Sequence, residues 1–211
     1  MNPAEHKTIV VGVTGASGAV LAQAALRLLE ADERVARIHL VVTDTGARLL
    51  AHELSIATSD SRQLPSLLVG GRADKTDVLP NRDVGASIAS GSYPVDAMVV
   101  IPCSMGMLAA VAGGTSDDLI ARAADVCLKE GRRLVLCVRD TPFSRIHLEN
   151  MLRAQQAGAV IMPAIVSFYH QPKTIDDLVA QYVFRVLAQM DLQQEQAYRW
   201  EGQAKRKARE A

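Results

Sequence analysis

Two hydrophobic patterns alternate along this chain. Short apolar runs rich in valine and isoleucine are typical of buried strands, whereas apolar residues that recur every three or four positions are typical of amphipathic helices. The patterns predict strands over residues 8–13, 38–43, 97–101, 134–138 and 160–162, and helices over residues 19–30, 45–57, 117–129 and 144–157, after residue 104, and from residue 174. Repeated strand–helix units with buried strands favour an α/β fold, a doubly wound parallel sheet with helices on both faces.

The alternation stops between residues 59 and 92, where polar residues, glycine and proline prevail. We expect a long connection there, and long connections in compact domains are usually functional or mobile. No internal repeat or second domain is visible, so residues 1–190 are predicted to form one domain. Residues 191–211 are predicted to form a polar C-terminal tail, because Trp200 is followed by a basic run typical of a solvated or frayed helix.

Two turns rich in serine and glycine follow predicted strands. Gly15-Ala-Ser-Gly18 comes after the first strand, and Ser104-Met-Gly-Met107 comes after the strand over residues 97–101. In an open parallel sheet, ligands bind at the carboxyl ends of the strands, and the free N–H groups of a following helix suit a phosphate. The two turns therefore predict a phosphate-bearing cofactor held between them.

The first turn argues against a nicotinamide cofactor. Gly15 and Gly18 are followed by Ala19-Val-Leu, without the third glycine of the G-x-G-x-x-G fingerprint. Asp44, which follows the second predicted strand, could still accept a hydrogen bond from a ribose hydroxyl. By itself, a single glycine turn is equally well explained as a tight strand-to-helix connection.

Charge and composition limit the possible partners. The 211 residues contain 23 Lys plus Arg and 23 Asp plus Glu, so net charge recruits neither nucleic acid nor an anionic membrane. Apolar runs stay below the roughly 20 residues of a membrane span, and the N-terminus lacks a signal-peptide pattern. We therefore expect a cytoplasmic protein. The three cysteines, Cys103, Cys127 and Cys137, do not have the spacing of a disulfide framework or zinc motif, and are expected to pack as small hydrophobes.

Three cations lie near the predicted cofactor site. Arg122 and Lys129 are seven residues apart and project from one helix face, and Arg139 follows the strand over residues 134–138, which delivers it to the rim of the Ser/Gly turns. Such a group would suit a second phosphate besides that of the cofactor. From spacing alone, a solvated helix face explains Arg122 and Lys129 slightly better.

Ordered sequence blocks along residues 7–190 resemble the UbiX-type flavin prenyltransferases. The blocks are Gly15-Ala-Ser-Gly18, Ala89-Ser-Gly-Ser92, Ile101-Pro-Cys-Ser-Met-Gly106, Leu119-Ile-Ala-Arg-Ala-Ala-Asp-Val126, Arg139-Asp-Thr-Pro142, Ile146-His-Leu-Glu-Asn-Met-Leu152, Ala157-Gly-Ala-Val-Ile-Met-Pro163, Phe168-Tyr-His-Gln-Pro172 and Ile175-Asp-Asp-Leu178. A long ordered series is far more specific than one glycine motif.

This resemblance implies a flavodoxin-like or Rossmann-like fold that binds FMN, with active sites between subunits of a homododecamer. Enzymes of this family transfer a dimethylallyl group from dimethylallyl monophosphate to N5 and C6 of reduced FMN without a metal. The product, prenylated FMN, is the cofactor of a UbiD-type decarboxylase.

The resemblance also assigns roles to individual residues. FMN contacts fall to Gly15, Ala16, Ser17, Thr43, Ser104, Met105, Gly106, Met107 and Arg139. Prenyl-phosphate contacts fall to Arg122, Lys129, Tyr169 and Arg185, of which Arg122 and Lys129 reach across a subunit boundary. Ser17, Glu53, Lys129 and Asp140 are the implied catalytic residues, with Ser17 near the flavin N5 and the two carboxylates managing protons.

Besides Thr43, where the family usually has a serine, and Ala19-Val-Leu, where some members have a Tyr-Gly pair, two further positions depart from the family pattern. Asp140 replaces the usual glutamate, and Val84 stands near the place of a tryptophan that precedes Ala-Ser-Gly-Ser in well-known members. These departures leave open a flavin carrier without catalysis. A second alternative is an FMN-dependent cysteine decarboxylase, which uses a catalytic histidine and an Asn-containing turn. Here the turn reads Cys103-Ser-Met-Gly, and neither His147 nor His170 has an equivalent context.

Overall fold

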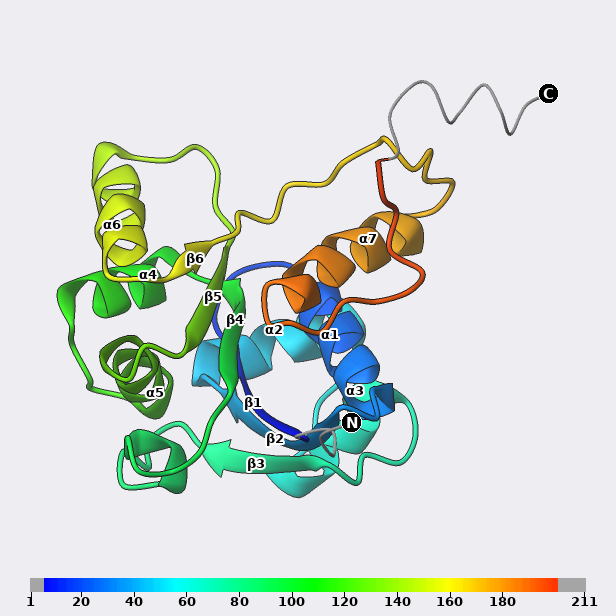
Figure 1. Cartoon of the computed structure of the whole chain (residues 1–211). Coiled ribbons are helices and arrows are strands. Elements are labelled where there is room, and N and C mark those ends of the chain that lie inside the picture. Colours follow the sequence, from blue (N-terminus) through cyan, green and yellow to red (C-terminus); the bar gives the residue numbers. More distant parts are fainter. Residues whose placement is uncertain (1–5, 201–211) are drawn as a thin grey trace, which may run out of the picture.

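A six-stranded parallel sheet forms the centre of the protein, whose computed structural model describes residues 6–200 (Figure 1). The strands are β1 (Lys7–Val13), β2 (Val35–Val42), β3 (Thr76–Pro80), β4 (Ala97–Cys103), β5 (Arg133–Val138) and β6 (Val160–Ile161). Their spatial order is β3-β2-β1-β4-β5-β6, and every neighbouring pair is parallel. The order reverses between β1 and β4, and ligands of open α/β sheets bind at such a switch point.

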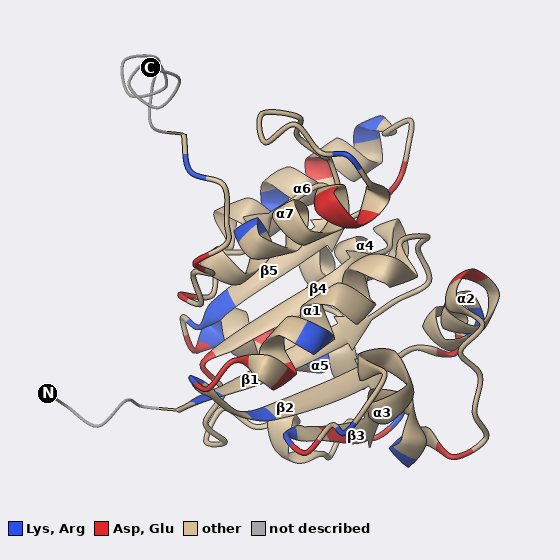
Figure 2. Ribbon diagram, turned by 90° about the vertical axis from the view of Figure 1, so that its right-hand side faces the viewer, with Lys and Arg blue, Asp and Glu red and all other residues tan. Residues whose placement is uncertain are grey.

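Helices cover both faces of the sheet, which confirms the predicted doubly wound class (Figure 1). One face carries α1 (Ala19–Ala31), α3 (Leu64–Val69) and α7 (Ile175–Ala188), and the other carries α4 (Met105–Gly113), α5 (Leu119–Lys129) and α6 (Arg145–Gln156). The remaining helix, α2 (Asp44–Leu54), follows β2 and lies beyond the ends of the strands (Figure 2), where it contacts the start of α1.

Successive residues of each strand serve two different cores. In β4, Val99 and Ile101 belong to the core under α1 and α7, whereas Met98 and Val100 belong to the core under α4 and α5. Because side chains alternate between the faces of a strand, a sheet covered on both sides needs apolar residues at every position. This is why β4 reads as a continuous apolar run.

The three cysteines are buried in these cores as free thiols. Burial raises the pKa of the Cys127 and Cys137 thiols to about 12, and it raises that of Cys103 as well. A thiol with a raised pKa is a poor nucleophile at neutral pH. The predicted packing role of the cysteines is confirmed.

The predicted long connection between residues 59 and 92 was wrong in part. It contains α3, the edge strand β3, and two short 3-10 helices, Ser61–Gln63 and Ser87–Ala89. No residue of β3 is fully buried, so this strand lacks the apolar run that marks the central strands. The helix expected over residues 45–57 ends sooner, at Leu54, because Ser55 adopts a left-handed conformation with φ 56°.

The segment after α7 packs against the domain. Leu192 is fully buried, the guanidinium of Arg34 donates to the Gln193 carbonyl at 3.1 Å, and the Tyr198 N–H donates to Gln181 Oε1 at 3.0 Å. Residues 191–200 are thus held to the domain at Leu192 and Tyr198 but are otherwise largely exposed and form no helix, and the basic run after Trp200, for which a solvated or frayed helix was expected, lies outside the described residues. Over residues 6–200, no helix is both long enough and apolar enough to cross a bilayer.

Candidate functional site at the carboxyl ends of the strands

A buried threonine joins the two Ser/Gly turns. Thr14 Oγ1 donates to the Pro102 carbonyl at 2.8 Å and accepts the Ser104 N–H, also at 2.8 Å. The side chain thus uses its donor and its acceptor to hold the end of β1 against the end of β4. Thr14 was not among the residues predicted from the sequence, although its hydroxyl, directly before Gly15 at a strand end, was the available signal.

A cavity of about 300 Å³ lies between these turns. Its lining residues are Gly15, Ala16, Ser17, Leu49, Ser104, Met105, Arg139 and Asp140. All except Leu49 were predicted as cofactor-binding or catalytic residues. Arg139 Nε donates to the Ser17 carbonyl at 3.0 Å, which links the end of β5 to the first turn. Asp140 is exposed, and its Oδ1 accepts the Thr141 N–H at 2.8 Å.

An adjoining cavity of about 330 Å³ shares Gly15 and Ser104 with the first cavity. It lies at the start of two helices. Thr43 Oγ1 caps α2 by accepting the Gly46 N–H at 3.0 Å, and Ser104 Oγ caps α4 by accepting the Met107 N–H at 3.3 Å. Its lining residues also include the predicted Gly106 and Met107, and Thr14, Thr45, Ala110, Thr115, Asp117, Asp118 and Ala121.

The residues of this second cavity fit the phosphate of a flavin mononucleotide. The N-terminal ends of α2 and α4 carry the positive ends of the helix dipoles, and Thr43 and Thr45 add hydroxyl groups. A Cβ at Gly106 would meet no atom within 4 Å, so this glycine leaves space in the cavity. Asp118 also borders the cavity, but its Oδ1 caps α5 by accepting the Ala121 N–H at 2.8 Å.

Glu53 lies beside the cavities and is not one of their lining residues. Its Oε2 accepts the N–H groups of Gly18 at 2.9 Å and of Ala19 at 2.8 Å, at the start of α1. Burial alone would raise the pKa of Glu53, but hydrogen bonds from Gly18, Ala19 and Ser17, together with the charge of Arg139, lower it below its ordinary value. Glu53 is thus held as a carboxylate that fixes the first Ser/Gly turn.

Arg122 and Lys129 lie on α5, and Lys129 is far from the flavin-sized cavities of the same chain. It follows Ala121 by eight residues, roughly 12 Å along the helix, and it pairs with Glu130. Arg122 Nε donates to the Ala89 carbonyl at 3.1 Å, and Arg132 donates to the Gly91 carbonyl at 2.6 Å. These cations surround the turn over residues 89–92. Arg132 was not predicted from the sequence, where it stands beside Arg133 without a distinguishing motif.

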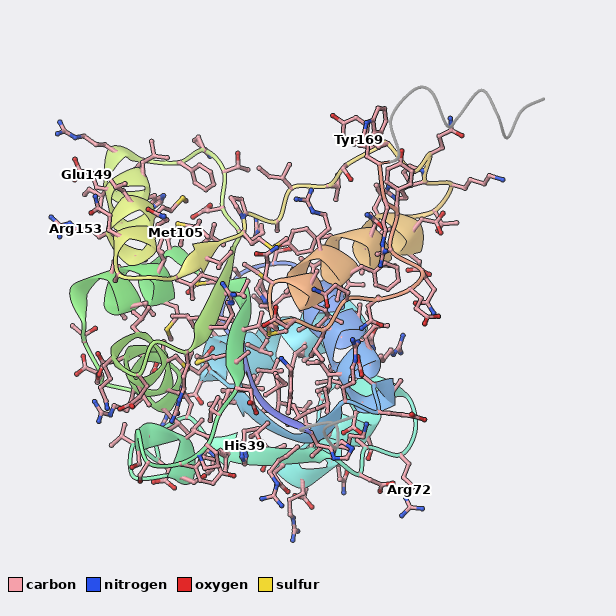
Figure 3. The ribbon with its side chains drawn as sticks, in the orientation of Figure 1. His39, Arg72, Met105, Glu149, Arg153 and Tyr169 are labelled. Carbon is pink, nitrogen blue, oxygen red and sulfur yellow. The ribbon has the colours of Figure 1, made fainter. Side chains whose placement is uncertain are left out.

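Tyr169 precedes α7 and Arg185 belongs to it, and α7 covers the opposite face of the sheet from α5 (Figure 1). Tyr169 lies on the loop before α7, on a different side of the molecule from Met105 (Figure 3). Its exposed ring makes an edge contact with Trp200, with the ring centroids 5.7 Å apart. Arg185 is exposed in the last turn of α7. One chain therefore does not bring the four predicted prenyl-phosphate residues together.

The histidines considered for a decarboxylase are not lining residues of either cavity. His147 completes a capping box with Ser144 at the start of α6, and the ring of His170 lies 6.5 Å from that of Tyr198. His147 thus has a capping role, and neither ring is placed to act on a group bound in the cavities.

Comparisons with known proteins agree with this fold and site. Residues 2–186 match the model of the Flavoprotein family, so fold and site define a flavoprotein. The flavin prenyltransferase UbiX of Halalkalibacterium halodurans is 43% identical over 191 residues, which are 90% of this chain and 91% of that protein. The chain belongs to the UbiX-type flavin prenyltransferase family.

Two solved structures carry the similarity into three dimensions. The crystal structure of AnUbiX (PadA1) in complex with FMN and dimethylallyl pyrophosphate has a TM-score of 0.83 and 42% identity, covering 94% of this chain and 99% of that chain. A dodecameric FMN-dependent UbiX-like decarboxylase from Escherichia coli O157:H7 has a TM-score of 0.81 and 42% identity, covering 92% and 100%.

Proposed function

We propose that this protein is a flavin prenyltransferase that joins a dimethylallyl group from dimethylallyl monophosphate, or a related prenyl phosphate, to reduced FMN. The observation that carries the proposal is the pair of adjoining cavities at the ends of β1 and β4, in a chain of the UbiX-type family. The second cavity suits the FMN phosphate. The first, lined by Ser17, Met105 and Arg139, suits the flavin ring.

The bound FMN supplies the nucleophilic nitrogen and carbon that accept the prenyl group. The residues of the chain hold the two reactants and stabilise the departing phosphate. When the allylic C–O bond breaks, negative charge develops on the phosphate, and preorganised cations stabilise it. We assign this role to the charged groups of Arg122, Lys129 and Arg185, and we assign to the Tyr169 hydroxyl a hydrogen bond to the same phosphate. Ser17 would lie at the reacting end of the flavin, and the Asp140 carboxylate in the first cavity would transfer protons, whereas Glu53 fixes the first Ser/Gly turn.

Because one chain separates these phosphate-binding residues, the proposed active site needs more than one copy. We propose that Arg122 and Lys129 of one protomer reach the flavin site of a neighbour in a homododecamer. Exposed apolar side chains on α6, namely Ile146, Leu148 and Leu152, offer surface for such association. The prenylated FMN then passes to a UbiD-type decarboxylase. All three cysteines are free thiols, the usage that the reducing cytoplasm favours.

Anaerobic incubation with reduced FMN and a series of prenyl phosphates tests the proposal. We expect the mass of the flavin to increase by one dimethylallyl group, with release of inorganic phosphate from the monophosphate donor. Recovery of unmodified FMN with every donor, from protein that retains FMN, would leave a flavin-binding carrier as the function.

A further inference from the structure

A third cavity, the largest of the three at about 910 Å³, lies past the phosphate end of the proposed FMN site. It is bordered by α2, the carboxyl ends of β2 and β3, and the segment that leads to α3. It shares Thr43, Thr45 and Asp118 with the second cavity, so the two cavities meet at the first turn of α2. A group attached to a phosphate in the second cavity could continue into the third.

The position of this cavity in the sheet indicates a class of ligand. The order β3-β2-β1-β4-β5-β6 is that of sheets that bind a dinucleotide across both halves, on either side of the switch point. The proposed flavin site uses the β1–β4 crevice. The third cavity lies over β2 and β3, in the other half, where an acid that follows the second strand binds the ribose, usually about 20 residues after the glycine turn and here 26 residues after Gly18 (44 − 18). Asp44, directly after β2, borders it.

The lining of the cavity is chemically suited to a nucleotide. An apolar floor formed by Leu50, Leu64 and Leu79 can cover a purine ring, and ligand pockets are typically apolar with a few well-placed polar groups. The rim carries Arg48 and Arg82 for phosphate. Arg82 is paired with Asp44 at 2.8 Å, and both side chains are exposed, so this weak pair can open for a ligand.

We propose that the third cavity binds an adenylate. The source is either the AMP half of FAD, whose FMN half occupies the two flavin cavities, or a free adenine nucleotide beside bound FMN. The inference rests on the proposed function in one respect, the placement of the FMN phosphate in the second cavity.

Two blocking variants and one control test the proposal. Ala47 is exposed on α2 and borders the third cavity but neither flavin cavity, so Ala47→Trp fills the third cavity without entering a core. Pro80→Trp does the same from the opposite wall, at the exposed end of β3. His52→Trp is the control, because His52 is exposed on the same helix and borders none of the three cavities.

Binding of FMN, of FAD, and of AMP to the FMN-loaded protein is measured by flavin fluorescence and calorimetry. We expect an adenylate, in FAD or as AMP, to bind the unmodified protein and the His52→Trp control. Either blocking variant should weaken that binding at least tenfold while FMN affinity stays the same. Binding of AMP identifies the free nucleotide, and binding of FAD alone identifies the dinucleotide.

Two results would overturn the inference and leave the proposed function intact. One is FMN binding with no affinity for FAD or AMP. The other is adenylate affinity that neither blocking variant changes. Loss of FMN affinity in the unmodified protein would instead overturn the proposed function together with the inference.

Discussion

The carboxylate of Glu53, near the end of α2, accepts the N–H of Gly18 at 2.9 Å and so caps α1 from a different helix. Gly18 itself supplies no side chain for this purpose, and the first turn of α1 has no acidic residue of its own. A charge at a helix N-terminus is stabilising because the exposed N–H groups there carry partial positive charge. The contact holds α2 over the Ser/Gly turn that borders the first flavin cavity.

Glu53→Gln should lower the free energy of unfolding by about 0.5–1 kcal/mol at pH 7, since the contact is partly exposed. The lowered pKa of Glu53 determines the pH dependence: stabilisation is present above the ordinary value of 4.5 and is lost as pH falls through the lower folded-state pKa. Urea unfolding measured from pH 7 to pH 3 should therefore show the unmodified protein and Glu53→Gln becoming equal in free energy of unfolding at acid pH. Glu149→Gln on α6 is the control. A difference in free energy of unfolding that stays constant down to pH 3 would contradict this interpretation.

Gly106→Leu should abolish FMN retention without unfolding the protein. A new side chain at this position meets no atom within 4 Å and occupies the space assigned to the FMN phosphate. Gly113→Leu, at the other end of α4, also meets no atom within 4 Å and borders neither flavin cavity, so it should retain FMN. Flavin absorbance after desalting compares the two variants. Equal retention would place the phosphate elsewhere.

Lys129→Ala should weaken the use of prenyl phosphate while FMN affinity hardly changes. A hydrogen bond to a charged group contributes roughly 1.5–3 kcal/mol, which corresponds to a loss of about tenfold to more than a hundredfold. Formation of prenylated flavin at saturating FMN, with varied dimethylallyl monophosphate, measures this loss. Arg153→Ala, an exposed cation on α6, is the control and should behave like the unmodified protein.

Hybrid active sites should recover activity from two inactive proteins. If Lys129 serves the flavin site of a neighbour, mixing Lys129→Ala with Ser17→Ala chains creates some sites in which both residues are native. We expect partial recovery after dissociation and reassembly, and none when either variant is treated alone. Full activity of an isolated monomer would refute the shared site.

Asp140→Asn should lower the rate of the chemical step with little change in either affinity, because it removes an ionisable group from the first flavin cavity. Asp140→Glu should be tolerated or improve the rate, since it restores the longer carboxylate usual in the family. Single-turnover measurements separate the chemical step from binding. Unchanged rates in Asp140→Asn would remove Asp140 from the proton-transfer role.

Local chemistry is why the sequence alone predicted the α/β class and the two Ser/Gly turns. A strand buried on both faces needs continuous apolar residues, and a tight turn before a helix favours glycine and serine. The apolar runs of β1, β4 and β5 carry this information directly. The turns at Gly15 and Ser104 follow β1 and β4, so their meeting at one edge of the sheet followed from the parallel order.

Only the tertiary structure decided the features that depend on contacts between distant residues. The half-exposed edge strand β3 has no apolar run to reveal it. Thr14 joins two turns, and Glu53 caps a helix 34 residues earlier in the chain, through hydrogen bonds that no local pattern encodes. The cations on α5 matched a phosphate-binding role in spacing, yet the length of the helix places Lys129 away from the flavin cavities of its own chain. Helical periodicity specifies the face on which a side chain lies, whereas packing of the whole chain determines what that face meets.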